Sequence, residues 1–158
     1  MQAHALKVAT ELLPGPHGFG DAAASLRVVR SHRPFADFGD EDDEAKDGGG
    51  QLTAWVKRCA DLARSKDPAS QCAAAVLMEE TFAGCPPLRV SKLQVACTGV
   101  LLALVRQPAA PHACAAAMKA LAQLHVCLMQ VPAEAGGHTD AAALLGRLMT
   151  ELLKAMGA

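Results

Sequence analysis

The C-terminal two-thirds of the chain repeats one pattern, in which apolar residues recur three and four positions apart and proline or glycine interrupts them. This spacing places apolar side chains on one face of an α-helix, and proline is excluded from a helix interior. The pattern therefore predicts an all-α fold with helices over residues 51–66, 68–83, 89–107, 111–131 and 139–156. Asp67, followed by Pro68, is expected to cap the second of these helices, and Thr139 or Asp140 the last. The outer face of the last helix is expected to carry Arg147 and Glu151, which lie one turn apart and can pair. Short turns between the helices predict antiparallel neighbours.

The first 36 residues have a weaker version of this pattern. Residues 2–13 and about 21–30 predict two short helices, with Pro14 ending the first and Asp21 capping the second. Each has only a narrow apolar stripe. We therefore expect residues 1–36 to form a partly disordered N-terminal arm.

A highly charged segment separates this arm from the regular helices. Residues 37–50 contain seven acidic residues, one lysine and a closing glycine triplet. A segment of this composition cannot bury an apolar face. We expect a flexible linker over 37–50, followed by one α-helical domain over 51–158.

Two packings fit the five predicted helices. Helix 89–107 is apolar on nearly every side, which favours a closed bundle built around it. Alternatively, the helices form a short stack of hairpins over 51–84 and 89–131, followed by the last helix. The two hairpins begin about 38 residues apart, a spacing that resembles HEAT or armadillo repeats in layout only.

The composition is consistent with a helical protein and limits the kinds of partner that we expect. The chain lacks isoleucine and tyrosine, two residues that favour strands, and without asparagine it cannot carry an N-linked glycan. Its net charge of −1 gives no reason to expect nucleic-acid binding. The longest apolar stretch, about 95–105, is shorter than the roughly 20 residues of a membrane span, so we expect a soluble protein.

The six cysteines lie among apolar residues in helical segments, and the first 13 residues lack the apolar run of a signal peptide. We therefore expect free, mostly buried thiols in a reducing compartment. The predicted location is cytoplasmic or nuclear. A mitochondrial location is disfavoured by Glu11, Asp21 and the early Pro14-Gly15-Pro16 break, and secretion is not expected.

Candidate chemistry is sparse. His112 with Cys114, and His125 with Cys127, form two HxC pairs. Side chains two positions apart on a helix point about 200° apart, so neither pair can chelate a metal. Cys85, before two prolines, is the one candidate for an exposed thiol. We expect no catalytic, metal-binding or cofactor-binding residues.

A short docking segment is the most specific candidate site. Arg27, Arg30 and Arg33 precede Phe35 and Phe38, and an acidic run follows. Such a segment is suited to order on binding another protein. The alternative is that both phenylalanines pack against the helical domain.

The sole tryptophan shares its helical face with the predicted core, so we expect Trp55 to be buried rather than at a binding surface. Together these features predict a non-enzymatic protein–protein interaction or scaffold module that is part of a larger intracellular assembly. Two alternatives remain. One is a small helical enzyme using a cysteine thiol or a bound cofactor, and the other is a piece of a larger helical-repeat protein.

Overall fold

The computed structural model describes residues 2–14, 20–37, 49–107 and 110–157. Every regular element within these residues is helical, as predicted. Two short 3-10 helices, η1 (Pro34–Asp37) and η2 (Ala133–Ala135), accompany the α-helices. The α-helices are α1 (Gln2–Leu12), α2 (Ala22–His32), α4 (Gly49–Ala63), α5 (Pro68–Gly84), α6 (Pro87–Val105), α7 (Pro111–Gln130) and α8 (Gly137–Ala155).

Capping residues set the starts of two of these helices. The Asp21 carboxylate accepts hydrogen bonds from the first backbone N–H groups of α2, at 3.0 and 3.1 Å. Asp67 accepts one from Ser70 N at 3.2 Å, and Pro68 follows at the first helical position. Side-chain acceptors at these positions satisfy N–H groups that have no partner within the helix. Both predicted caps are confirmed.

The start of α8 differs from the prediction. We expected Thr139 or Asp140 to cap the helix, but α8 begins earlier, at Gly137, after Gly136 in the left-handed conformation (φ 83°). A side chain at Gly137 would lie 2.5 Å from the Val131 carbonyl oxygen. Because only glycine fits this close approach, the chain turns and enters the helix before either expected cap.

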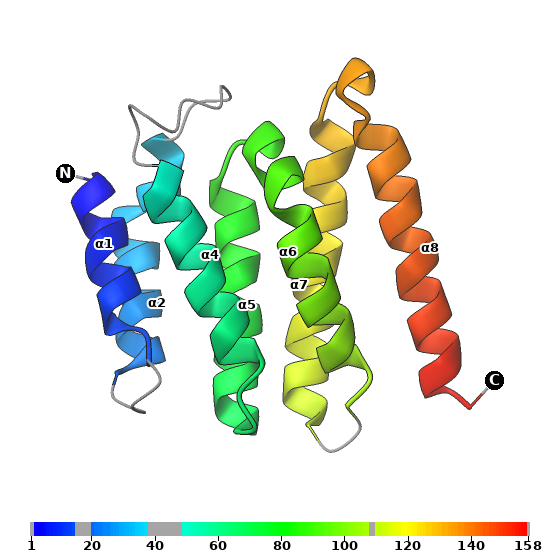
Figure 1. The fold of residues 1–158 in the computed structure, drawn as a ribbon, viewed down its shortest axis with the longest axis horizontal. Helices are drawn as coiled ribbons and strands as arrows, with labels where there is room; N and C mark the ends of the chain where they lie inside the picture. The colour runs from blue at the N-terminus through cyan, green and yellow to red at the C-terminus, as the bar shows by residue number, and fades with distance from the viewer. Residues whose placement is uncertain (1, 15–19, 38–48, 108–109, 158) are drawn as a thin grey trace.

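The helices form pairs that lie side by side in a row, with α1 and α2 at one end and α8 at the other (Figure 1). Consecutive helices form the hairpins α1–α2, α4–α5 and α6–α7. Neighbouring hairpins contact each other through their first helices, α1 with α4 and α4 with α6, and through their second helices, α2 with α5 and α5 with α7. The last helix, α8, contacts both α6 and α7.

The two N-terminal helices belong to this row instead of forming an arm apart from it. Leu6 and Leu13 of the first hairpin are buried, and Val29 joins the same core. The Ser25 hydroxyl donates to the Ala9 carbonyl at 2.8 Å and ties α2 to α1. Pairing lets two narrow apolar stripes combine into one buried face, which is why each stripe looked too weak alone.

The charged segment predicted as a linker precedes α4. Most of residues 37–50, including Phe38, lies outside the described residues. The last two, however, belong to α4, which begins at Gly49. The flexible linker over 37–50 stays a prediction.

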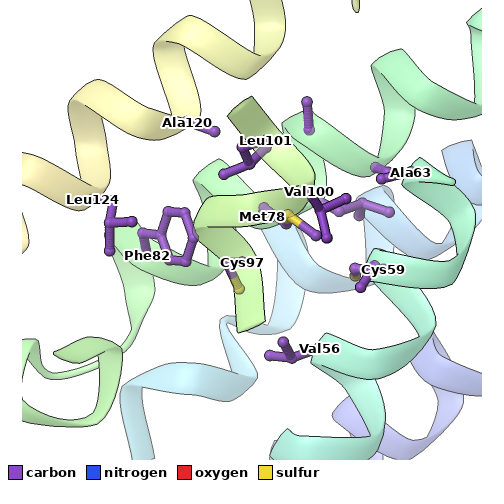
Figure 2. Packing of buried hydrophobic residues seen from close by; sticks show 14 of the residues in the cluster. Val56, Cys59, Ala63, Met78, Phe82, Cys97, Val100, Leu101, Ala120 and Leu124 are labelled. Atoms are coloured by element: carbon purple, nitrogen blue, oxygen red, sulfur yellow. The ribbon is translucent and has the colours of Figure 1, made fainter. Parts of the chain in front are cut away.

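The hydrophobic core extends along the whole row of helices and includes Trp55, which we predicted to be buried. Figure 2 shows Met78, Phe82 and Leu101 packed where α5, α6 and α7 meet. Trp55 is fully buried, as predicted, and its Nε1–H donates to the Thr81 hydroxyl at 2.8 Å. The polar atom of the indole is thereby satisfied inside an apolar environment.

We predicted that other helices would cover helix α6 on every side, but one of its faces is exposed. Val95 is 86% exposed, and Ala96, Gly99 and Ala103 are exposed on the same face. In a row, a helix is covered by its neighbours on some sides only, so the outer face of α6 stays open. Helix α6 has 19 residues and a mean hydropathy of 1.6 over an 18-residue window, so it is long and apolar enough to cross a membrane. Half of this window is buried within the fold.

Candidate functional site

The predicted docking residues are placed at the junction of α2, η1 and α5. Arg27, Arg30 and Arg33 are exposed. The Arg30 guanidinium pairs with the Glu80 carboxylate of α5 at 2.9 Å. Arg33 ends α2 in the left-handed conformation (φ 45°, ψ 56°). Arg30 and Arg33, together with the edge of Phe35, line a groove of about 510 Å³, whereas Arg27 does not contribute to it.

Phe35 itself is a core residue and not an exposed anchor. Its side chain is 1% exposed, and its ring lies 5.9 Å from that of Trp55, tilted by 51°. It also rests on Gly84, where an added Cβ would come within 3.2 Å of the ring. For Phe35, the alternative of packing against the helical domain therefore holds, because the ring fills the space left by this glycine. Phe38 lies outside the described residues.

The predicted exposed thiol is also buried. Cys85 is 5% exposed, and desolvation by burial raises the pKa of its thiol to about 12. It lies one turn after Thr81, so its side chain continues the buried face of α5 although its backbone has left the helix. A cysteine nucleophile acts as the thiolate, and burial disfavours that form. The burial of Cys85 could have been predicted from the sequence by extending the helical period of α5 by one turn.

Other thiols have similar surroundings. Cys59 and Cys97 are buried, and desolvation raises the pKa of both, that of Cys97 to about 12. Cys127 is buried and its pKa is raised for the same reason. Within the described part of the chain, no group of three or more His, Cys, Asp or Glu side chains is placed to hold a metal ion. These thiols act as small apolar core residues.

The most distinctive surface is apolar and lies on α7 and α8. Seven of the eight large apolar side chains that are exposed among the described residues belong to it. We call it the C-terminal apolar face, and it consists of Met118, Val126 and Met129 on α7 and Leu145, Met149, Leu153 and Met156 on or just after α8. Exposed apolar patches that collect on one part of a surface are typical of binding sites.

Helical spacing lines these residues up. On α8, Leu145, Met149 and Leu153 recur every four positions and form one stripe. On α7, Met118 and Val126 lie eight positions apart, with exposed Ala122 between them. The two helices contact each other, and the stripes adjoin where Val126 and Leu145 border the same pocket. A pocket of about 280 Å³ lies at their junction, lined by Leu121, Ala122, His125, Val126, Leu144, Leu145 and Leu148.

An ion pair holds α8 in place. Glu151 is 6% exposed, and the Arg106 guanidinium at the end of α6 donates two hydrogen bonds to its carboxylate. Hydrogen bonding from Arg106 lowers the pKa of this carboxyl below its ordinary range. We expected Glu151 on the outer face of α8, paired with Arg147. Instead, Glu151 faces inward, toward Arg106.

The exposed charges on these two helices have one sign. Lys119, Arg147 and Lys154 are exposed, whereas Asp140 is half-buried and Glu151 is buried. Helix α7 contains no acidic residue. Arg147 lies two positions from both Leu145 and Met149, on the side of α8 away from the apolar stripe, and the Lys154 ammonium lies 3.9 Å from the Glu151 carboxylate.

The comparisons with known protein families, with curated proteins and with solved structures find no match to this chain.

Proposed function

We propose that this chain is a non-enzymatic protein–protein interaction or scaffold module of a larger intracellular assembly, and that it binds through the C-terminal apolar face. The observation that carries the proposal is the concentration of exposed Met, Leu and Val side chains on two adjacent helices. Met149 and Leu153 are each about half exposed (51% and 50%) in the middle of this face. A partner that covered them would remove this apolar surface from water.

Methionines suit such a surface. Met118, Met129, Met149 and Met156 supply unbranched, polarisable side chains that adapt to the shape of a partner. The competing proposal of a cysteine enzyme lacks this kind of support, since the Cys85 thiol is buried and its pKa is raised. The groove at Arg30 and Arg33 is a weaker interaction site, because Glu80 already neutralises Arg30.

The experiment compares three full-length chains in affinity purification from a native-type cell extract. The chains are the wild type, the double variant Met149→Glu/Leu153→Glu, and the control Val95→Glu, which adds a charge to an exposed apolar position on α6. We expect the wild type and the control to recover the same protein in stoichiometric amounts, and the double variant to lose it. The recovered protein is then purified and its binding measured directly.

Equal recovery by all three chains would place the interaction elsewhere on the surface, and recovery of nothing specific would count against the module itself. Circular dichroism of each variant verifies the fold. Glutamate is a good helix former, and these positions are exposed, so the variants should retain their helices.

A second candidate function is that the chain forms part of a larger helical-repeat protein, resembling HEAT or armadillo repeats. The same exposed face supports it, because a further hairpin of the same polypeptide would cover α7 and α8. In that case the chain expressed alone should aggregate at micromolar concentration, and Met149→Glu/Leu153→Glu should improve its solubility. A wild-type chain that stays monomeric and soluble would argue against it.

A further inference from the structure

A separate groove lies between α4 and α6. Its volume is about 540 Å³, which is within the range of small-molecule sites. Ala63 and Arg64, at and just after the end of α4, line one side, and Gln71 of α5 also contributes. The other side is the exposed face of α6, from Val95 to Ala103. None of the described residues that line this groove belongs to the C-terminal apolar face.

The α6 side of the groove consists of small side chains. Ala96, Gly99 and Ala103 are exposed, and their spacing of three and four positions places them on one face of the helix. An added Cβ at Gly99 would meet nothing within 4 Å. A flat molecule can therefore approach the helix backbone closely here. The stripe is about 10 Å long, which suits a fused-ring molecule and is short for a partner helix.

Gln71 brings a buried hydrogen-bond acceptor to this groove. Its side chain is 5% exposed, and its Nε2–H donates to the Ser65 carbonyl at 2.8 Å. Because that carbonyl can only accept, the bond fixes the orientation of the amide. Its Oε1 has no hydrogen-bond partner among the described residues. Since Ser65 does not line the groove, the nitrogen end of the planar amide points away from the groove and the oxygen end toward it. A buried acceptor without a partner lowers stability, so a bound donor would relieve that cost.

The charges around the groove favour a neutral ligand. Of the described residues that line it, only Arg64 is charged, and its guanidinium pairs with the Asp61 carboxylate at 3.3 Å. Val100 and Leu104 add apolar side chains. A charged ligand would therefore lose its hydration here without gaining a free partner of opposite sign.

We propose that the groove between α4 and α6 binds a small, neutral, flat apolar molecule with one N–H or O–H group, which donates a hydrogen bond to Gln71 Oε1. The ring of this ligand lies against Ala96, Gly99 and Ala103. Because the groove is separate from the C-terminal apolar face, its ligand is an addition to the proposed function and does not depend on it.

The test compares indole with N-methylindole, in which a methyl group replaces the hydrogen of the N–H group. Each compound is titrated into the isotope-labelled full chain, and NMR follows the backbone amides of Gly99 and Ala103 and the side-chain amide of Gln71. We expect indole to bind about two- to tenfold more tightly, as one neutral hydrogen bond would provide. Burial of apolar surface alone would give the reverse order, because the methyl group adds apolar surface.

Variants assign the site. Gln71→Met keeps the length of the side chain and removes the acceptor, so the preference for indole should disappear. Gly99→Leu places a side chain where the ring would lie and should weaken indole binding by about tenfold or more. This variant should fold normally, because an added Cβ has open space there and leucine favours a helix more than glycine does. Gly146→Leu is the matched control on α8, where an added Cβ also meets nothing within 4 Å, and it should leave indole binding unchanged.

Three results would overturn this assignment. N-methylindole binding as tightly as indole would mean that no ligand group donates to Gln71 Oε1, which would leave that atom to a bound water molecule. Unchanged indole binding by Gly99→Leu would place the compound elsewhere on the chain. Absence of saturable shifts with either compound at millimolar concentration would mean that the groove is not a site for such molecules.

Discussion

Replacing Phe35 with alanine tests whether this residue belongs to the core or to a binding surface. The ring is 1% exposed and contacts the Trp55 ring at a centroid distance of 5.9 Å. Truncating a buried phenylalanine costs about 3–5 kcal/mol, and an aromatic pair contributes about 0.5–1.5 kcal/mol of such a loss. Phe35 also borders the groove of about 510 Å³, so its neighbours have room to relax. We therefore expect a loss near the low end, about 3 kcal/mol.

Such a loss is large for a single domain, whose free energy of unfolding is about 5–15 kcal/mol. The assay is urea unfolding followed by tryptophan fluorescence, which reports on Trp55 alone because the chain has one tryptophan and no tyrosine. For an m-value of about 1–3 kcal/mol/M, the midpoint should fall by about 1–3 M urea with an unchanged slope. Far-UV circular dichroism gives an independent probe.

Phe35→Leu is the matched control, since it retains most of the buried volume and should cost less than about 1.5 kcal/mol. The reasoning would be refuted if Phe35→Ala lost under about 1 kcal/mol. If the same variant also lost binding to a partner, the ring would belong to a docking segment after all.

Four further predictions concern a thiol, two glycines and a carboxylate. Because burial raises the pKa of Cys85 to about 12, iodoacetamide at pH 8 should alkylate it far more slowly in the native chain than in urea, as measured by mass spectrometry. Gly146→Ala should raise the free energy of unfolding by about 0.5–1 kcal/mol, since nothing lies within 4 Å of the added Cβ. Gly137→Ala should lower it by about 1–3 kcal/mol, because that Cβ would meet backbone at 2.5 Å. The pKa of Glu151 is lowered in the folded chain, so its contribution to stability is complete above the unfolded pKa, about 4.3, and is lost as pH falls through the folded value. Melting temperatures measured between about pH 6 and pH 2 should therefore fall less with acid in Glu151→Gln than in the wild type.

Each of these expectations has a contrary result. Rapid alkylation of native Cys85 would mean an accessible thiol and would revive the enzyme alternative. A destabilising Gly146→Ala, or a neutral Gly137→Ala, would contradict the packing around α8. Equal acid sensitivity of the wild type and Glu151→Gln would mean that the contact with Arg106 does not perturb the carboxyl.

Sequence pattern predicted the helices well because proline, glycine and capping residues act locally. Asp21 and Asp67 were identified as caps from their position alone, and both accept the expected hydrogen bonds. Trp55 was placed in the core from its spacing with neighbouring apolar residues. These features depend on contacts within a few positions along the chain.

The burial of Phe35 and of Glu151 has a different cause, namely contacts between residues far apart in sequence. Phe35 is buried because Gly84, 49 positions later, leaves space for its ring. Glu151 faces inward because Arg106 reaches it from the end of α6. The exposed stripe on α8 reads in sequence like a core-facing stripe, since periodicity shows that a face is apolar but not whether another helix covers it.

The linear order of the helices affects how the molecule unfolds. Since each helix contacts only near neighbours in the row, stability is expected to be graded along it instead of shared equally. Amide hydrogens in α5 and α7, which have neighbours on both sides, should exchange most slowly. Those in α8, which has neighbours on one side, should exchange through local opening. A partner bound at that end would slow their exchange without any change in the middle of the row.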